Sequence, residues 1–182
     1  KDNSKKIVKG DTFIAIKGIN DDGHNYIEEA IKNGAIRIIC EKGSYDVETV
    51  LVDDTKKFLK EYLKLHCPNL KFIGITGTNG KTTTAFLIYQ VLNSLNIKCA
   101  YIGTIGYYLE NKITDLENTT PDMLDLYNFF ELAYQEGFEY VVLEVSSHAL
   151  SQNRCDFIEF DYAIFTNLTQ DHLDYHGTME NY

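Results

Sequence analysis

The sequence predicts an α/β fold with a mostly parallel sheet, preceded by a smaller α/β domain. Apolar runs that are typical of strands alternate with segments in which apolar residues recur at helical spacing. A glycine-rich stretch, residues 74–84, lies between one such strand and one such helix. Strands that alternate with helices run parallel and are joined by right-handed crossovers, so their carboxyl ends meet at one edge of the sheet.

The first 67 residues are predicted to form the small α/β domain. Strands are expected over residues 11–16, 35–40 and 49–52, and a helix over residues 25–33, where Gly34 ends it. A second helix follows, with Asp53 or Asp54 at its N-cap. Pro68 disfavours helical geometry in the residue before it, so we place the domain boundary there and expect domains at 1–67 and 68–182.

The second domain is predicted to begin with a buried strand over residues 71–75, which leads into the glycine-rich stretch and a helix. In that helix Ala85, Phe86, Ile88, Tyr89, Val91, Leu92 and Leu95 recur at helical spacing. Further strands are expected over residues 99–105, 139–145 and 160–166. This order of elements gives the domain its parallel strands.

Between these strands, residues 112–119 are polar and are expected to form a loop. Thr120-Pro121-Asp122 then predicts a helix start with the Thr120 hydroxyl at the cap, and Gly137 marks the end of this helix. Three polar residues fall at the carboxyl ends of strands, where ligands of such sheets bind: Thr76, Glu144 and Asn167.

Composition excludes some classes of protein. The net charge of −10 argues against a nucleic-acid partner, because proteins that bind a phosphate backbone carry a basic face. No apolar run is long enough to span a bilayer, so no membrane insertion is expected. The four cysteines are scattered without a CxxC pair, which favours reduced thiols and a cytoplasmic location over a disulfide framework or a zinc site.

Residues 77–83, Gly-Thr-Asn-Gly-Lys-Thr-Thr, have the composition of a phosphate-binding loop. Glycines let backbone N–H groups turn toward an anion, and the helix start adds the positive end of its dipole. Lys81 is placed to reach the phosphates of a nucleoside triphosphate. The Thr82 hydroxyl is placed to bind a magnesium ion. The first glycine of the general pattern would fall at Ile75, with Gly74 and Gly77 on either side. A glycine-rich surface turn is the alternative, which the flanking strand and helix disfavour.

Glu144 ends a predicted buried strand, where a carboxylate is costly unless it is paired or on a metal. Magnesium shared with Thr82 is the predicted partner, and a solvated strand end is the alternative. Residues 171–176, Asp-His-Leu-Asp-Tyr-His, suggest either a second metal or acid–base site with the acids as ligands, or a polar loop that caps a helix. Arg154 is either a two-pronged donor to a carboxylate or phosphate, or a surface arginine.

Together these stretches resemble the Mur ligases, the ATP-dependent enzymes that build the peptidoglycan stem peptide. The resemblance covers essentially the whole chain. Five blocks carry it, namely residues 10–13, 74–84, 118–121, 144–150 with Gln152 and Arg154, and 167–177. The third and fourth blocks are similar to members that add the third amino acid rather than the terminal dipeptide.

The resemblance implies roles for individual residues. Lys81, Glu144 and His172 would be catalytic, with Thr82 and Glu144 on a first magnesium ion and His172 on a second. The ATP loop would comprise Gly77, Thr78, Asn79, Gly80, Lys81, Thr82 and Thr83. The muramoyl dipeptide would be bound by Asn118, Thr119, Thr120, Ser146, Gln152 and Arg154. In the small domain, the uridine diphosphate would be bound by Ser4, Ile19, Asn20 and Asp21.

The activity that the resemblance implies is ADP-forming amide ligation in peptidoglycan synthesis. ATP would activate the glutamate carboxylate of UDP-N-acetylmuramoyl-L-alanyl-D-glutamate as an acyl phosphate, and a diamino acid would attack it. The Ser146-Ser147-His148 sequence favours meso-diaminopimelate over L-lysine. Family members continue past Tyr182 with a lysine carbamate and an amine-selecting domain, so the resemblance implies an N-terminal fragment that is inactive alone and a monomer when full length.

Two other functions stay open at this stage. One is a different P-loop enzyme, such as a small-molecule kinase or a relative of folylpolyglutamate synthetase. The match in the small domain and at residues 118–121 speaks against it. The other is a binding module for a nucleotide or a UDP-sugar with a vestigial ATP loop, against which the intact Lys81, Thr82 and Glu144 speak.

Overall fold

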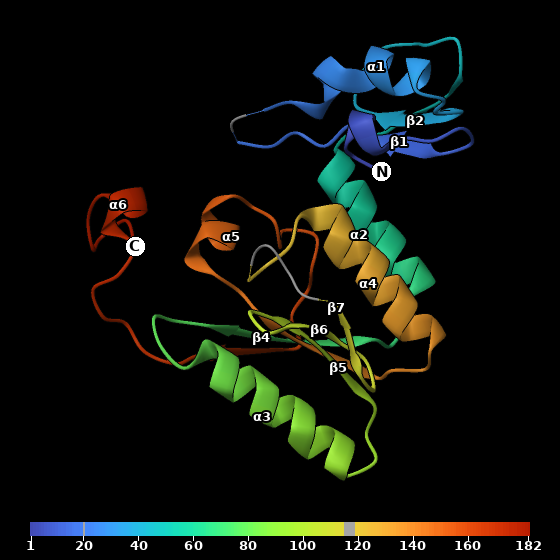
Figure 1. The fold of residues 1–182 in the computed structure, drawn as a ribbon. Helices are drawn as coiled ribbons and strands as arrows, with labels where there is room; N and C mark the ends of the chain where they lie inside the picture. The colour runs from blue at the N-terminus through green and yellow to red at the C-terminus, as the bar shows by residue number, and fades with distance from the viewer. Residues whose placement is uncertain (20, 115–118) are drawn as a thin grey trace. The chain divides into compact units, whose positions relative to one another are not determined.

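The computed structural model describes residues 1–19, 21–114 and 119–182, with the backbone alone for Lys112 and Thr114. The chain divides into two compact units, Lys1–Leu65 and His66–Tyr182 (Figure 1). The first unit therefore ends at Leu65, where the sequence predicts residue 67. Each unit has a sheet of its own.

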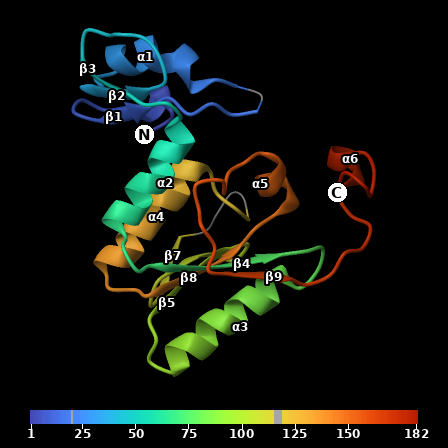
Figure 2. The ribbon, with the colours of Figure 1, turned by 180° about the vertical axis from the view of Figure 1, so that it is seen from behind.

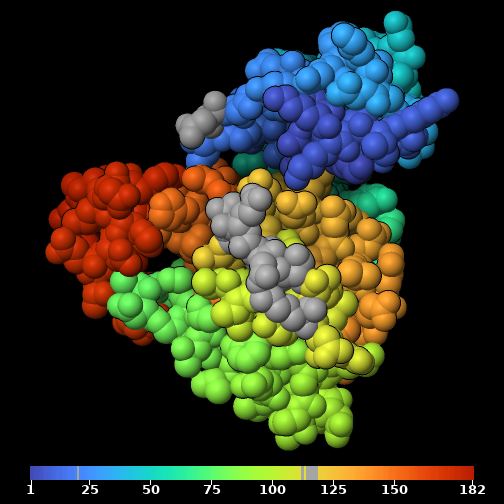
Figure 3. Space-filling model, viewed as in Figure 1, coloured from blue at the N-terminus to red at the C-terminus, as the bar shows by residue number. Residues whose placement is uncertain are grey.

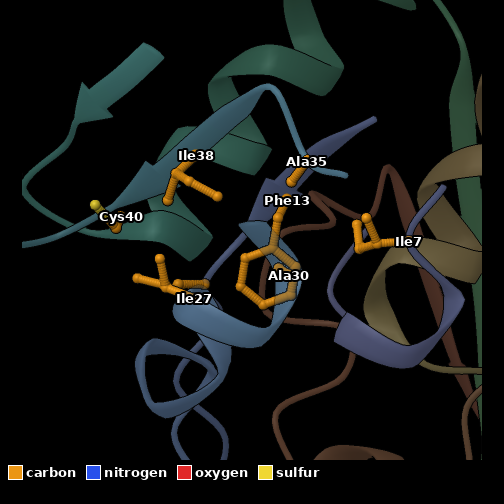
Figure 4. Packing of buried hydrophobic residues seen from close by; sticks show 8 residues of the cluster. Ile7, Phe13, Ile27, Ala30, Ala35, Ile38 and Cys40 are labelled. Atoms are coloured by element: carbon orange, nitrogen blue, oxygen red, sulfur yellow. The ribbon is translucent and has the colours of Figure 1, made fainter. Parts of the chain in front are cut away.

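The first unit is built on a parallel sheet in the order β1-β2-β3. Its elements are η1 (Ser4–Lys6), β1 (Thr12–Ile14), η2 (Gly23–Tyr26), α1 (Ile27–Lys32), β2 (Arg37–Cys40), β3 (Glu48–Leu51) and α2 (Thr55–His66), whose last residue is the first of the second unit. Figure 4 shows the core of this unit, in which Phe13 of β1 and Ile38 of β2 are buried in one cluster with Ile27 and Ala30 of α1. The apolar sides of strands β1 and β2 and of helix α1 are therefore buried against one another in a single core.

The elements of the first unit follow the predicted order with shorter strands. The helix expected from residue 25 begins as a 3-10 turn at Gly23 and becomes α-helical at Ile27. Gly34 follows it with φ +111°, a conformation that favours glycine. At α2, the Asp54 carboxylate accepts the N–H of Lys57 at 2.8 Å, which confirms Asp54 as one of the two predicted caps.

The second unit contains a six-stranded sheet among its described residues, in the order β7-β6-β5-β8-β4-β9. Its strands are β4 (Lys71–Thr76), β5 (Cys99–Gly103), β6 (Gly106–Tyr108), β7 (Lys112–Thr114), β8 (Tyr140–Glu144) and β9 (Tyr162–Phe165). Strands β5, β8, β4 and β9 run parallel, and β6 and β7 extend the sheet antiparallel. The predicted mostly parallel sheet is confirmed.

The helices of the second unit are α3 (Lys81–Ser94), α4 (Met123–Gln135), α5 (Ser147–Ser151) and α6 (Leu173–His176). Helix α3 covers one face of the sheet, and α4 and α5 lie on the other (Figures 1 and 2). Tyr89 of α3 is buried in one cluster with Ile73 of β4. On the other face, the rings of Phe72 and Phe130 lie 4.8 Å apart between centroids. Successive residues of β4 thus pack against opposite layers, as strand geometry requires.

Two expectations for the second unit are wrong in detail. The predicted loop at residues 112–119 begins as strand β7, because residues 112–114 pair antiparallel with β6, Thr114 opposite Tyr107 and Lys112 opposite Tyr108. Helix α4 begins at Met123 with Asp122 at its N-cap, and the Thr120 hydroxyl donates instead to the Glu144 carbonyl at 2.8 Å. The predicted helix after the glycine-rich stretch is confirmed as α3, which lies at the surface (green in Figure 3), and Val91 and the C-cap residue Leu95 are 54% and 63% exposed.

No helix in the described parts of either unit has both the length and the apolar character that crossing a bilayer requires.

Candidate functional site

The glycine-rich loop joins the end of β4 at Thr76 to the start of α3 at Lys81. Gly77 has φ +124°, and a Cβ there would overlap the Thr166 hydroxyl and lie 2.9 Å from the Asn167 carbonyl. Gly80, the N-cap of α3, has φ +84° and open space beside it. Position 77 therefore requires glycine for its backbone conformation and for the close approach of its neighbours, whereas position 80 requires glycine for its backbone conformation alone.

The segment after β9 holds this loop in place. The Thr78 N–H donates to the Asn167 carbonyl at 2.9 Å, and the Asn79 N–H donates to Asn167 Oδ1 at 3.1 Å. The Asn79 carbonyl in turn accepts from Asn167 Nδ2 at 3.0 Å and from the Thr166 hydroxyl at 2.8 Å. Asn167, predicted at the carboxyl end of its strand, thus lies against the phosphate loop.

Lys81 lies within the same loop. Its Nζ donates to the carbonyls of Gly77 at 2.7 Å and Thr78 at 3.0 Å. The ammonium group is thereby kept beside the backbone of residues 77–80 at the N-terminus of α3. A cation and a helix N-terminus in one place favour an anion such as a phosphate.

Glu144 lies across from the loop at the end of β8 and is fully buried. Its Oε2 accepts from the Thr82 hydroxyl at 2.8 Å, and its Oε1 accepts from the Tyr101 hydroxyl and from the Thr104 N–H at 2.9 Å. The alternative of a solvated strand end is therefore wrong. Burial, reinforced by the bond to Glu144, raises the pKa of Tyr101, so this phenol stays a donor at neutral pH.

The oxygens of Thr82 and Glu144 fit a magnesium ion. Both are hard ligands, they lie within 2.8 Å of each other, and they face the loop that carries Lys81. Magnesium in nucleotide sites keeps several waters and substrate oxygens, so one carboxylate and one hydroxyl from the protein are sufficient. Within residues 1–19, 21–114 and 119–182, no group of three or more His, Cys, Asp or Glu is arranged as a metal site.

The residues expected to bind the muramoyl dipeptide gather beside Glu144. The buried Thr120 hydroxyl accepts the Ser146 N–H at 3.0 Å while it donates to the Glu144 carbonyl. Arg154 donates from NH1 to the Thr120 carbonyl at 2.7 Å and from NH2 to Gln152 Oε1. Arg154 is thus an integrated part of the site and not a free surface arginine. Thr119 joins through its hydroxyl, which lies 3.2 Å from that of Thr104. Asn118 lies outside the described residues.

His172 lies with other rings at the α5–α6 contact. Its ring centroid is 4.9 Å from that of His148 and 6.3 Å from that of Tyr182. Desolvation of the His148 ring lowers its pKa. The contacts found among the described residues join His172 to neither Thr82 nor Glu144, so its expected metal role stays a prediction.

Tyr175 and His176 also belong to this contact. The Tyr175 hydroxyl accepts from Gln152 Nε2 at 3.2 Å, and His176 Nε2 lies 3.0 Å from the Ser147 hydroxyl. The Asp-His-Leu-Asp-Tyr-His segment therefore docks on α5, next to Gln152 of the expected substrate set. The sequence placed this segment after a strand, but its spacing gave no indication of this partner.

In the first unit, Ser4 is buried and its hydroxyl donates to the Glu29 carboxylate on α1. The expected uridine loop is closed by the Gly18 N–H, which donates to the Asp21 carbonyl at 2.8 Å, and Ile19 is 57% exposed. Asn20 lies outside the described residues. Ser4 and the loop therefore share no contact among those described, and their joint role stays a prediction.

Sequence reasoning missed Tyr101, Gly103 and Thr104. They lie at the carboxyl end of β5, which pairs with β8 through Ile102 and Leu143. Since the carboxyl ends of parallel strands lie at the same edge, the position of the predicted strand 99–105 was the available signal. Their partner Glu144 is 40 or more residues away in the sequence, so no local spacing links them.

The parallel sheet, with one strand leading through a glycine loop and Lys-Thr into a helix, defines a P-loop nucleotide-binding protein. Residues 75–182 match the model of the Mur ligase middle domain, and residues 3–76 match that of the Mur ligase family catalytic domain. The chain belongs to the Mur ligase family.

Curated relatives include UDP-N-acetylmuramoyl-L-alanyl-D-glutamate–2,6-diaminopimelate ligases from Fusobacterium nucleatum, 45% identical, and Aquifex aeolicus, 46% identical. The matches cover 98% and 99% of this chain, which spans 38% of the length of each relative.

Solved structures give the same fold. The structure of a UDP-N-acetylmuramoyl-L-alanyl-D-glutamate–2,6-diaminopimelate ligase is similar at 33% identity and a TM-score of 0.77, over 99% of this chain and 38% of that one. The MurF ligase of Thermotoga maritima in complex with ADP matches at 26% identity and a TM-score of 0.60, over 98% of this chain and 39% of that one.

Proposed function

We propose that this chain forms the ATP-binding and UDP-muramoyl-dipeptide-binding part of an ADP-forming ligase of peptidoglycan synthesis. The ligase adds meso-diaminopimelate to UDP-N-acetylmuramoyl-L-alanyl-D-glutamate. The observation that carries the proposal is the hydrogen-bonded connection from Thr82 of the phosphate loop, through Glu144 and Thr120, to Arg154. The names of the diaminopimelate-adding relatives support the choice of substrates.

The proposed reaction has two steps. A glutamate carboxylate oxygen bonds to the γ-phosphorus of ATP, the bond from that phosphorus to the β–γ bridging oxygen breaks, and ADP leaves. The amine nitrogen of the diamino acid then attacks the acyl carbon, the C–O bond to phosphate breaks, and the amine gives up a proton. Magnesium, when bound, would neutralise charge on the phosphates.

The chain's own residues position the two substrates and neutralise the charge of the phosphates. The bonds to the Gly77 and Thr78 carbonyls hold Lys81 Nζ beside the loop. When ATP binds, Nζ donates to phosphate oxygens in their place and neutralises part of the phosphate charge. Arg154, fixed by Thr120 and Gln152, presents remaining guanidinium donors to a carboxylate of the acceptor. Thr82 and Glu144 would hold the magnesium ion through their side-chain oxygens. In the first unit, Ser4 and the loop with Ile19 and Asp21 are assigned to the uridine diphosphate.

A lysine substitution tests the phosphate loop. By the full-length protein we mean a chain that contains residues 1–182 and any sequence that continues them. In that protein, Lys81→Ala should lower amine-dependent ADP release by about three orders of magnitude, because it removes the ammonium group that neutralises charge on the transferred phosphoryl group. Lys98→Ala is the matched control, since Lys98 caps the Glu136 carbonyl next to the amino end of β5. Equal turnover in folded Lys81→Ala and control enzymes would overturn the mechanism.

The uridine assignment is tested by titrating UDP-muramoyl-dipeptide against the amide NMR signals. The signals of Ser4, Ile19 and Asp21 should shift, together with those of Thr119 and Ser146 in the second unit. Shifts confined to residues 77–83 would contradict the assignment.

A second experiment identifies the amine substrate. ADP release in the full-length protein is measured with diaminopimelate and with lysine in parallel, and we expect turnover with diaminopimelate.

A further inference from the structure

The two oxygens of the Glu144 carboxylate have different neighbours. Oε1 is held by the Tyr101 hydroxyl and the Thr104 N–H, both from the end of β5. Oε2 accepts from the Thr82 hydroxyl at 2.8 Å and from the Thr104 hydroxyl at 3.2 Å. Since the side chain is fully buried, each of these donors offsets part of the cost of removing a carboxylate from water. The donors to Oε1 are Tyr101 in β5 and Thr104 directly after that strand, whereas Thr82, a donor to Oε2, belongs to the phosphate loop.

We propose that Tyr101 and Thr104 are positioning residues that hold Glu144 so that Oε2 and the Thr82 hydroxyl face a divalent cation together. This inference rests on the proposed function, because that function places the cation at Thr82 and Glu144. The Tyr101 hydroxyl and the Thr104 N–H fix Oε1, and the Thr104 hydroxyl also holds Oε2, so the carboxylate can rotate little about its own axis. Such outer partners orient metal ligands and set their affinity.

Gly103 makes this arrangement possible. A Cβ at position 103 would overlap both Glu144 Oε1 and the Tyr101 hydroxyl, and would lie 2.6 Å from the carboxyl carbon of Glu144. The carboxylate therefore occupies the space that a side chain on β5 would fill. Gly103 lacks the positive φ of a turn glycine, since the positive-φ residues of the described chain do not include it. Glycine is therefore required at position 103 only because Glu144 and Tyr101 approach the backbone so closely.

The position of the Tyr101 hydroxyl is set by packing of the ring. The ring is fully buried and meets Phe86 edge-to-face at 5.4 Å and Tyr108 at 5.7 Å between centroids. Removal of the hydroxyl alone leaves these aromatic contacts in place. Tyr101→Phe therefore separates the bond to Glu144 from the packing of the core.

Thr104 adds a connection to the acceptor side. Its hydroxyl lies 3.2 Å from both Glu144 Oε2 and the Thr119 hydroxyl, and a hydroxyl donates one hydrogen at a time. Thr119 belongs to the segment assigned to the muramoyl dipeptide. Thr104→Ser keeps this hydroxyl and Thr104→Val removes it at nearly equal volume, so the pair tests the hydroxyl itself.

The test measures binding of Mn²⁺ with ADP to the full-length protein by electron paramagnetic resonance, and binding of ADP without metal by calorimetry. Tyr101→Phe should weaken Mn²⁺ binding about tenfold or more and leave metal-free ADP binding unchanged. Tyr108→Phe is the matched control, because its ring lies in the same aromatic cluster, and it should keep wild-type Mn²⁺ affinity. Thr104→Val should weaken Mn²⁺ binding and Thr104→Ser should restore it.

A purely structural role for the Tyr101 hydroxyl would lower the melting temperature and leave Mn²⁺ affinity at the wild-type value in folded protein. That result, with tight Mn²⁺ binding by the wild type, would overturn this inference and leave the proposed function standing. Absence of Mn²⁺–ADP binding in the wild type would instead overturn both. If Tyr101→Phe does not fold, wild-type Mn²⁺ affinity in Thr104→Val would overturn the inference.

Discussion

Strands β8 and β9 flank β4 on its two sides, and both deliver polar groups to the phosphate loop, but they differ in burial. Four of the five residues of β8 are buried, including Glu144 at its end. In β9, Tyr162 is 56% and Phe165 is 63% exposed, and the strand lies at the edge of the sheet. The same sheet therefore presents one functional group from its interior and another from an exposed margin.

The difference lies in how each group is fixed. On the β8 side a buried side chain is held by donors from β5 and α3, so its position depends on the core. On the β9 side Asn167 and Thr166 are held by bonds to the loop itself, through Asn79. We expect substitutions on the β8 side to act on metal binding and catalysis strongly, and those on the β9 side to act on loop geometry and on association more mildly.

The largest effect is expected for Glu144→Gln in the full-length protein. The amide keeps the size of the side chain but removes its charge, so turnover should fall about 10³-fold through loss of cation binding. ADP release and Mn²⁺ affinity are the measurements, with circular dichroism to confirm the fold. Near-normal turnover by a folded variant would show that β8 does not supply the metal ligand, and the comparison would fail.

A smaller effect is expected for Asn167→Ala. This change removes two side-chain bonds to Asn79 at 3.1 and 3.0 Å, each worth about 1 kcal/mol, so ADP affinity should fall up to about thirtyfold as the loop loosens. Asn93→Ala is the control, because Asn93 donates to the Tyr89 and Cys99 carbonyls near the C-terminal end of α3 and makes no bond to the loop among those described. ADP affinity measured by calorimetry should be unchanged in the control, and an equal loss in both variants would contradict the role of Asn167.

The smallest effect on stability is expected for Phe165→Lys. Because Phe165 is exposed, the free energy of unfolding should change by about 0.5 kcal/mol or less, while self-association of the 182-residue chain should decrease. Sedimentation velocity measures the association. Leu51→Lys, at the 61% exposed end of edge strand β3, is the control for a general charge effect. Equal reduction by both would show that the β9 edge has no special part in association.

The sequence was sufficient for the parts of the fold that depend on short continuous patterns. Strand β4, the loop with Gly77 and Gly80, and helix α3 are contiguous, so residue order alone predicts them. Prediction from the sequence was wrong where one side chain had two possible hydrogen-bond partners. Thr120 has the features of a helix cap, but its hydroxyl bonds to the Glu144 carbonyl, which only the paired β8 brings within reach.

The same reason explains the omissions at the site. Glu144 was found because a carboxylate at a strand end is costly to bury, and Lys81 because of its loop. Tyr101 looked like any aromatic core residue, since its ring packs in a cluster and only its hydroxyl distinguishes it. His172 was assigned to a metal through the family resemblance alone, and the contacts of its ring with His148 and Tyr182 were not readable from spacing.

The bonds between the loop and the segment after β9 also set an order of assembly. They join residues 88 and 91 positions apart, from Asn79 to Asn167 and from Thr78 to Thr169. During synthesis by the ribosome, β4 and α3 emerge long before these partners, and chain closure over such a distance is slow. A nascent chain that ends before residue 166 has the glycine loop without its support. Ligand binding by the loop is therefore a late event in the maturation of this domain.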